Sequence, residues 1–477
     1  TKSKARVSHM DDISGSDIEP DSPKQDSPKA KSKKKSKSTK KGKKQSKEKE
    51  EASTEIFTVY QHIRLKDKDT GPKEPRAVSL PLYDEDTKKF VWQTRQVSAA
   101  LITMFDECLV NVSDHHTNHR RKVTDLNVYF DIKTGSVSIK NNGPGIPCYQ
   151  LWIRQETDTR KILIDKLDDL DEKEVARILK EHPSEVYWNP EVITTHTQSG
   201  TNLTKRKDHR TGGTNGIGLK CTVYQSKKFK ITTVDENRKI KYVQEFEDQP
   251  DLKFMKIHPP TITRYDDPGS DKKWDPKKHA PFTKIEFTPE YTLFGGESYT
   301  PDNFGHVVFE YIRMRLYQLR VYTGMHITFM DKDIPITSLV EYAMMHVSAE
   351  NDEEIDSDSE KSSEVENPKV AHCVMEYTGN AANAEKYKWE VAIIANLSHE
   401  DRHVTLVNGI YPYNGGTHIS YMMNQLIPGI QDFLRHELGK RSDEMKSINK
   451  GGALTKKIWN KIQIFAKCPM DGPSFWG

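Results

Sequence analysis

The sequence is poor in cysteine and lacks any long apolar run. Its 477 residues contain 5 cysteines, which are scattered and form no C-x-x-C pair, at Cys108, Cys148, Cys221, Cys373 and Cys468. This usage argues against a disulfide framework and a structural zinc site, so we expect a reducing, intracellular compartment. No stretch approaches the roughly 18 apolar residues of a membrane span, and no secretory signal pattern begins the chain. We therefore expect no membrane partner.

Charge of a single sign is concentrated in two segments, although the formal net charge is only +3. Residues 29–49 contain 12 lysines against one acid, Glu48, and residues 350–366 contain nine acids against one lysine, Lys361. Either run is typical of a solvated tail or loop. The lysine run is equally typical of a nuclear import signal or of loose attachment to a polyanion such as DNA.

Composition and pattern divide the chain into three parts. Residues 1–54 are rich in Lys, Ser, Asp and Pro and too poor in apolar residues to fold, which predicts a disordered lysine-rich tail. Regular patterns then predict an α+β domain over 55–289. They begin again in a second α+β domain over 290–477, whose stretch 349–367 we expect to be a disordered acidic insert.

Periodicity predicts the principal helices and strands. Helices are expected at Val97–Asn111, at Phe304–Tyr322, at Ile419–Glu437 with an interruption at Pro428, and at Thr455–Lys467, and residues 160–182 are expected to form one or two surface helices. Strands are expected at 126–130, 136–139, 229–233, 240–246, 283–287, 326–329, 389–395 and 404–407.

A polar stripe interrupts the first apolar helix. Glu107, Asn111 and Asp114 are spaced at i, i+4 and i+7 and therefore share one face. A glutamate there could orient and deprotonate a water, while an asparagine oxygen one turn away could bind Mg²⁺ carrying phosphates. Taken alone, the stripe is also typical of an ordinary surface turn of helix.

A glycine-rich turn follows the second predicted strand, at Asn141-Asn142-Gly143-Pro144-Gly145-Ile146-Pro147. Two glycines around a proline make a tight turn that could present the side chain of Asn141 to the exocyclic amine of a purine. A plain β-turn explains the same residues equally well when they are taken alone.

A second glycine-rich segment runs from Thr211 to Lys220, after Ser199-Gly200-Thr201-Asn202. Glycines bring backbone N–H groups close to phosphate oxygens, and a helix beginning near Gly218 would add its dipole. Lys220 could supply a point charge for a phosphate. The spacing G-x-x-G-x-G is neither that of a P-loop nor that of a dinucleotide fold, and a flexible surface loop is the ordinary alternative.

The order and spacing of these three motifs resemble the GHKL ATPases. Neighbouring residues narrow the resemblance to the eukaryotic-type DNA topoisomerase II family, a type IIA enzyme. They are Tyr83-Asp84-Glu85-Asp86, Phe105 through Asn111, Asn141 through Pro147, Val407-Asn408-Gly409-Ile410 and Gly415-Gly416-Thr417-His418. The resemblance covers the chain from about residue 56 to its end. It implies a GHKL (Bergerat) α/β sandwich ATPase domain followed by a transducer domain of mixed sheet and long helices.

The resemblance also implies roles for individual residues. Glu107 is similar to the catalytic general base and Asn111 to the Mg²⁺ ligand, while Asn141 matches the adenine-side contact. The segment Gly200, Thr201 and Asn202 matches a ribose and phosphate contact. The phosphate-enclosing loop is matched by Gly213, Thr214, Asn215, Gly216, Ile217, Gly218, Leu219 and Lys220. Tyr60 is similar to a tyrosine of the N-terminal strap that reaches the partner's nucleotide.

The implied function is an ATP-binding and ATP-hydrolysing clamp, the N-gate. It would use ATP and Mg²⁺, form a homodimer through the ATPase domain, and close around double-stranded DNA. Closure would drive strand passage for relaxation and decatenation, together with a DNA cleavage core that this sequence does not contain. A nucleus or a viral DNA replication compartment is the implied location. The alternatives are a GHKL clamp of a chaperone or of mismatch repair, and a nucleotide-gated binding module without hydrolysis; Glu107 argues against the second.

Several residues depart from the family pattern. Gly200-Thr201 replace two serines, Thr214 and Ile217 replace an arginine and a tyrosine, and His115 replaces an asparagine. Residues 150–187 are longer than this connection is expected to be. Such a divergent but complete set would suit an enzyme of a large DNA virus.

The end of the sequence matters for the γ-phosphate. In the family, the segment that Gly472–Gly477 resembles is followed by a Q-T-K loop whose lysine contacts the γ-phosphate. The sequence ends at Gly477. The triplet Gln93-Thr94-Arg95 lies upstream of the motif helix and is no substitute. The sequence is therefore interpreted as an N-terminal portion of a larger enzyme.

Overall fold

The computed structural model describes most of the chain after residue 56. The described residues are 57–68, 70–156, 161–196, 199, 212–213, 216–268, 271–347, 370–378, 386–395, 402–438 and 453–473. The expected lysine-rich tail at 1–54 and the acidic insert at 349–367 lie outside these ranges. No helix within them is long and apolar enough to cross a membrane.

The larger sheet has nine strands in the order β10-β9-β8-β12-β4-β3-β13-β14, with β11 beside β9. The strands are β3 (Asp125–Asp131), β4 (Ser136–Asn142), β8 (Ser226–Asp235), β9 (Ile240–Gln249), β10 (Phe254–Ile257), β11 (Thr261–Arg264), β12 (Phe282–Pro289), β13 (His326–Phe329) and β14 (Lys332–Asp333). Alternate residues of β9 are buried, including Ile240, Tyr242 and Phe246. Because every second side chain is buried, one face of the sheet packs against the core.

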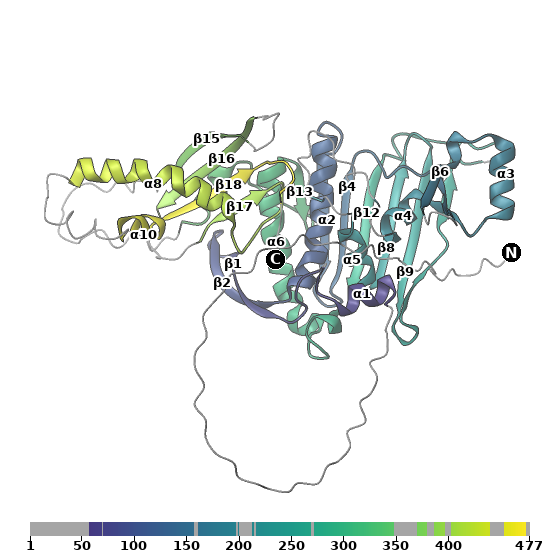
Figure 1. Ribbon diagram of the computed structural model, residues 1–477, viewed down its shortest axis with the longest axis horizontal. Helices are drawn as coiled ribbons and strands as arrows, with labels where there is room; N and C mark the ends of the chain where they lie inside the picture. The colour runs from purple at the N-terminus through teal and green to yellow at the C-terminus, as the bar shows by residue number, and fades with distance from the viewer. Residues whose placement is uncertain are drawn as a thin grey trace, which may run out of the picture.

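Helices cover that face of the sheet. They are α1 (Val59–Leu65), α2 (Ala99–Asn118), α4 (Asn189–Thr195), α5 (Gly218–Tyr224) and α6 (Pro301–Thr323). In Figure 1, α2 runs alongside β4 near the middle of the molecule, with α5 close to it. The hydroxyl of Ser98 accepts a hydrogen bond from the backbone N–H of Leu101 at 3.3 Å and so caps the start of α2. The predicted helix at Val97–Asn111 is confirmed from Ala99 onward and continues to Asn118, whereas Val97 is the last residue of β2.

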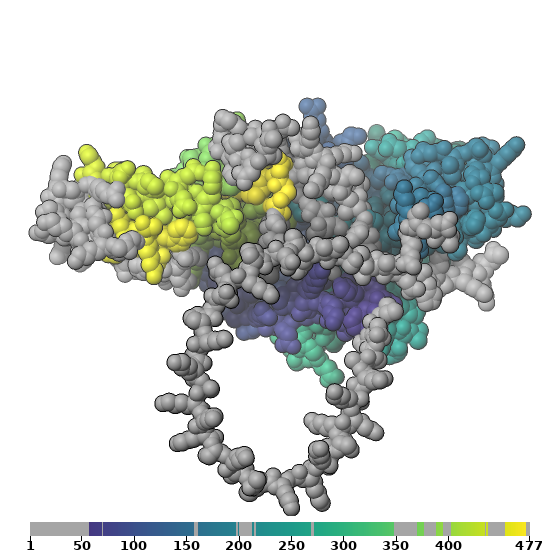
Figure 2. Space-filling model, viewed as in Figure 1, coloured from purple at the N-terminus to yellow at the C-terminus, as the bar shows by residue number. Residues whose placement is uncertain are grey.

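A second sheet of four strands follows, in the order β15-β16-β18-β17. Its elements and those beside it are α7 (Leu339–Met344), β15 (Ala371–Thr378), β16 (Lys386–Ala395), β17 (Val404–Val407), α8 (Thr417–Leu438), α10 (Ala453–Trp459) and β18 (Ile462–Cys468). Trp389, Met422 and Ile464 belong to the small core between this sheet and its helices. Figure 2 shows α8 and α10 at one end of the molecule.

Two smaller pieces complete the fold. A hairpin of β1 (Arg76–Tyr83) and β2 (Phe90–Val97) packs on α6. The connection between β4 and α4 forms an inserted unit with its own core around Trp152 and Ile178. It consists of β5 (Gln150–Gln155), β6 (Ile162–Lys166), η1 (Leu167–Asp169), α3 (Glu172–Glu181) and β7 (Val186–Trp188). Two further short 3-10 turns are η2 (Pro250–Leu252) and η3 (Tyr291–Phe294).

The structure corrects three predictions of secondary structure. Residues 160–182 begin with the strand β6 before the helix α3, so the stretch is not helical throughout. The expected helix at Thr455–Lys467 is a short helix, α10, followed by the strand β18. Helix α8 continues through Pro428 without the expected interruption.

The predicted domain boundary at residues 289 and 290 falls within the larger sheet. After α6 the chain returns to that sheet, because β13 pairs in parallel with β3, from His326 beside Asp125 to Phe329 beside Val128. The division between the two sheets therefore lies after β14. One continuous hydrophobic cluster, from Leu101 on α2 to Phe465 on β18, joins the two parts.

Candidate functional site

The polar stripe of α2 faces the second glycine-rich segment. A Cβ at Gly218 would lie 1.7 Å from Oε2 of Glu107, so α5 begins directly against this carboxylate, and a larger residue at 218 would displace the glutamate side chain. A Cβ at Gly213 would lie 3.3 Å from Oδ2 of Asp114 and 3.7 Å from Oδ1 of Asn111. The structure thus brings together three polar groups and two glycines that the sequence placed in separate motifs.

Glu107 is held in an environment that disfavours its charge. Burial and, to a lesser extent, the nearby carboxylates of Asp106 and Asp114 raise the pKa of its carboxyl to about 7, against the lowering effect of Lys220. A carboxyl that titrates near neutral pH can both accept and release a proton under physiological conditions. Glu107 therefore has the protonation behaviour of a general base.

Asn111 lies one turn after Glu107 and is half-buried. Its side-chain oxygen has no hydrogen-bond partner among the described residues. An amide oxygen is a ligand that Mg²⁺ accepts, and this ion usually completes its shell with waters and substrate phosphates rather than with a protein cage. The donor set accordingly fits the ion that the family resemblance implies, although the described residues contain no cluster of three His, Cys, Asp or Glu side chains suited to a metal.

Asp114 binds the glycine-rich segment to α2. Its two carboxylate oxygens accept hydrogen bonds from the backbone N–H groups of Gly212 at 2.8 Å and Gly213 at 3.0 Å. Asp114 is only 4% exposed, so this link is shielded from water. The positive φ of Gly216, +62°, then turns the chain toward α5.

The structure describes only some of the remaining residues of the predicted phosphate loop. Gly216, Ile217, Gly218, Leu219 and Lys220 are described, and the predicted helix start near Gly218 is confirmed. Lys220 is 2% exposed and donates a hydrogen bond from Nζ to the carbonyl oxygen of Ser199 at 2.6 Å. Burial lowers the pKa of its ammonium group to about 8. The predicted site residues Gly200, Thr201, Asn202, Thr214 and Asn215 lie outside the described residues.

The two asparagines at the end of β4 have different surroundings. Asn141 has the same parity as Val137 and Ile139, so its side chain enters the covered face of the sheet, where it is 4% exposed. The oxygen of the Asn142 side chain accepts hydrogen bonds from the backbone N–H groups of Thr124 at 2.8 Å and Asp125 at 2.9 Å. Asn142 therefore stabilises the start of β3, whereas the side chain of Asn141 lies on the face covered by α2.

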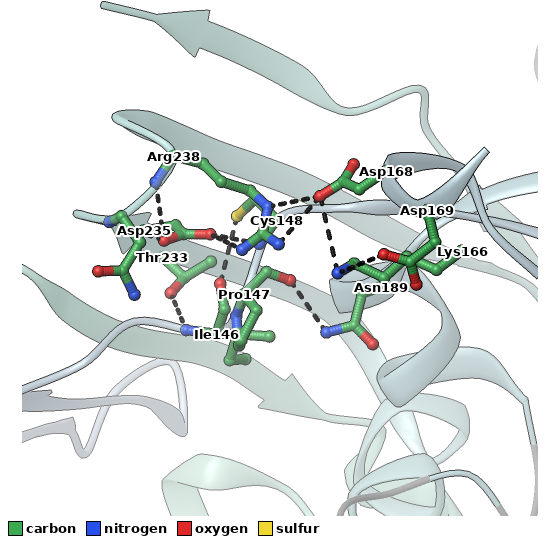
Figure 3. A network of polar contacts seen from close by, with 11 residues as sticks. Ile146, Pro147, Cys148, Lys166, Asp168, Asp169, Asn189, Thr233, Asp235 and Arg238 are labelled. Atoms are coloured by element: carbon green, nitrogen blue, oxygen red, sulfur yellow. Dashed lines mark hydrogen bonds and ion pairs between the residues drawn. The ribbon is translucent and has the colours of Figure 1, made fainter. Parts of the chain in front are cut away.

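The turn after β4 is built into the sheet. A Cβ at Gly145 would lie 1.9 Å from the carbonyl oxygen of Val234, which requires glycine there. The hydroxyl of Thr233 accepts a hydrogen bond from the N–H of Ile146, and the carboxylate of Asp235 accepts one from the N–H of Cys148, both at 2.8 Å. These contacts are shown in Figure 3. They hold the position of Asn141 at the strand end.

Two side chains link this turn to the inserted unit and to α4. Arg238 donates hydrogen bonds to Asp168 of η1 at 3.0 and 3.1 Å and to Asp235 at 3.1 Å. Asn189 donates a hydrogen bond to the carbonyl oxygen of Pro147 at 2.9 Å. In Figure 3 these side chains surround the turn on the side of the insertion.

Comparison with known proteins shows which enzymes the chain resembles. The chain is 26% identical over 422 residues, 87% of its length, to DNA topoisomerase 2 of Saccharomyces cerevisiae. It is 31% identical over 239 residues, 50% of its length, to DNA topoisomerase 2 of African swine fever virus. The fold matches the ATPase and transducer domains of DNA topoisomerase II from Balamuthia mandrillaris, with a TM-score of 0.64 and 20% identity over 88% of this chain and 86% of that one. Over most of its length the chain is therefore similar to DNA topoisomerase II enzymes.

The solved structure with the matching fold is one of ATPase and transducer domains. The chain spans 24% of the length of the yeast relative and 16% of the viral one. No protein-family model matches the sequence. Because the relatives include cellular and viral enzymes, the viral origin suggested by the divergent motifs stays a prediction.

Tyr60, which the resemblance places in an N-terminal strap, is hydrogen-bonded within its own chain in this structure. The hydroxyl of Tyr60 donates a hydrogen bond to Asp248 at 2.7 Å, and Arg64 pairs with the other oxygen of that carboxylate at 2.7 Å. Tyr60 is 7% exposed. Reaching a partner's nucleotide, which stays a prediction, would require α1 to leave Asp248.

A buried polar network, absent from the sequence-based prediction, joins α2 to the second part of the chain. Arg315 of α6 is 0% exposed and donates hydrogen bonds to Asp106 at 2.6 Å and to the carbonyl oxygen of Gly409 at 2.9 Å. The neighbouring Asn408 exchanges two hydrogen bonds, both of 2.9 Å, with the backbone of Met470. The predicted V-N-G-I motif is thus a turn that contacts both α6 and the segment after β18.

Proposed function

We propose that this region of a topoisomerase II binds and hydrolyses ATP. The observation that supports this best is the close approach of the Glu107 carboxylate to the start of α5 at Gly218. Glu107 lies on the same face of α2 as Asn111 and Asp114. This arrangement places a proton acceptor, an oxygen ligand and glycine backbone side by side. The three together are what transfer of a phosphoryl group to water requires.

Each of these groups has a separate task in hydrolysis. Asn111 would hold Mg²⁺ through its side-chain oxygen, and the bound ion would offset negative charge on the phosphates. The glycine backbone would lie close to the phosphate oxygens. Glu107, whose pKa is raised to about 7, would orient the attacking water and take its proton.

ATP binding would also close a clamp. We propose a homodimer formed through the ATPase domain that encloses double-stranded DNA as the N-gate and acts with a DNA cleavage core. Closure would drive strand passage for relaxation and decatenation. The lysine-rich residues 29–49 suit a nuclear or viral replication compartment, where DNA is the abundant polyanion.

The decisive experiment compares turnover with binding. In Glu107→Gln, ATP turnover should fall by roughly 10² to 10⁴, because a general base is lost, while ATP affinity should stay within a few-fold. Glu297→Gln, on an exposed loop, is the matched control and should leave both unchanged. Turnover near that of the unsubstituted protein in Glu107→Gln would refute the assignment.

DNA dependence separates the clamp from its alternatives. A topoisomerase clamp should hydrolyse ATP faster when duplex DNA is added, whereas a chaperone clamp should not respond.

A second experiment tests the lysine run at residues 29–49. Removing residues 1–50 should flatten the plot of log DNA affinity against log salt concentration by about 0.9 for each DNA phosphate that the lysine run neutralises. An unchanged slope would assign the lysine run to import rather than to DNA.

A further inference from the structure

A histidine on α2 contacts the side chain of Asn141. His115 lies four residues after Asn111, and its Nδ1 is 3.1 Å from Nδ2 of Asn141. The same Nδ2 donates a hydrogen bond to the backbone carbonyl oxygen of Asn142 at 2.8 Å. The amide nitrogen of Asn141 therefore has two neighbours, a carbonyl oxygen and a ring nitrogen.

These two neighbours determine which way the amide points. The carbonyl oxygen of Asn142 can only accept, so the amide atom that faces it is the nitrogen. That nitrogen has two hydrogens, and the second points to His115 only if Nδ1 of the ring carries a lone pair. His115 must then be neutral with its proton on Nε2. Consistently, burial, with contributions from His119 and His116, lowers the pKa of His115 to about 4.

This arrangement leaves the other end of the amide available. Oδ1 of Asn141 has no hydrogen-bond partner among the described residues. An amide oxygen is an acceptor only, so it complements a base edge that donates, such as an exocyclic amine. It would repel a base that carries a carbonyl oxygen at the same position. An amide turned the other way would have the opposite preference.

We propose that His115 is a specificity-determining residue that, by accepting from Nδ2 of Asn141, keeps Oδ1 directed at the base and selects a 6-aminopurine over a 6-oxopurine. The proposal rests on the proposed ATP function, since it assumes that a purine nucleotide enters beside Asn141. His115 acts on the base through Asn141. It is thus a positioning residue and not a catalytic one.

Two substitutions of His115 separate this role from general packing. His115→Leu keeps a branched side chain with carbon atoms at the δ positions but removes the acceptor. His115→Asn places an amide oxygen at the δ position, where it can still accept from Asn141. His116→Leu is the matched control, because the His116 ring hydrogen-bonds the carbonyl oxygen of Val123 at 2.7 Å instead.

The measurement is the ratio of two affinities on the full 477-residue chain. Calorimetric titration with the β,γ-imido analogues of ATP and GTP, in the presence of Mg²⁺, gives both dissociation constants for each variant. We expect the preference for the adenine nucleotide to fall about threefold to tenfold in His115→Leu, the contribution of one hydrogen bond. It should be retained in His115→Asn and in His116→Leu. Damage to the fold alone would weaken both nucleotides equally and leave the ratio unchanged.

The possible outcomes separate the role of His115 from the proposed ATP function. If the unsubstituted chain binds both analogues and the ratio in His115→Leu equals that of the unsubstituted chain, the role of His115 is refuted and the proposed ATP function stands. If the unsubstituted chain binds neither analogue, the proposed function fails, and the role of His115 fails with it.

Discussion

Replacing Glu107 by glutamine should stabilise the fold as well as remove hydrolysis. The carboxyl has an ordinary pKa of 4.5, and the folded protein raises it to about 7. A carboxyl whose pKa is raised by folding binds a proton more tightly in the folded chain than in the unfolded one. Its ionisation therefore destabilises the fold as the pH rises from about 4.5 through 7. A neutral glutamine avoids this cost.

The size of the effect follows from the shift. A displacement of about 2.5 pKa units corresponds to about 3 kcal/mol once the pH exceeds 7. At pH 5 the folded chain holds Glu107 protonated, whereas the unfolded chain does so only in part. The same linkage then makes the destabilisation about 1 kcal/mol. Because part of the Glu107 surface is accessible, these figures are upper limits. The gain should still be several times larger at pH 8 than at pH 5.

Denaturant unfolding of both proteins at pH 5 and pH 8 measures this difference. Glu297→Gln, which lies on an exposed loop, serves as the control and should change the midpoint at neither pH. Equal stabilities of Glu107→Gln and the unsubstituted protein at pH 8 would show that the carboxyl is not held in an unfavourable environment. A gain of the same size at both pH values would assign the effect to packing instead of charge.

Three further substitutions test other parts of the structure. Arg315→Met should destabilise the fold by about 3–5 kcal/mol in denaturant unfolding, because Asp106 is left without its buried partner; a loss below about 1 kcal/mol would contradict this. Lys220→Met should raise the pKa of Glu107, since the lysine charge lowers it, so the acidic limb of the pH–rate profile should move to higher pH; an unmoved limb would count against the coupling. Gly145→Ala should cost about 1–3 kcal/mol in thermal unfolding and weaken nucleotide binding, because its Cβ would lie 1.9 Å from a carbonyl oxygen of β8; unchanged stability would show that the turn can shift freely.

Local pattern was enough to predict much of the fold. The three-and-four spacing from Ala100 to Leu109 predicted α2, and alternation predicted the strands β3 and β4. The errors arose where a short apolar run fits either period. Ile162-Leu163-Ile164 and the run around Ile464 form strands, although charged neighbours suggested helices.

The contacts that assemble the site were out of reach of local pattern. Asp114 and Gly212 are 98 residues apart, and Asp106 and Arg315 are 209 apart. A single sequence carries no periodicity that links such positions. Glu107 and Asn111 could be found because they share one helix. The partner of His115 became visible only once α2 and β4 were placed side by side.

The return of the chain to the larger sheet has a practical consequence for dissecting this protein. A recombinant fragment that ends at residue 289 would lose α6 and β13. The free edge of β3 would then lack its parallel partner, and Asp106 would lack Arg315. Bare strand edges recruit strands from other chains, so such a fragment should aggregate. Ile327 and Phe329 of β13 are 0% and 4% exposed, so losing them would also open the core. A fragment of the first part that folds by itself must therefore extend at least through Asp333, the end of β14.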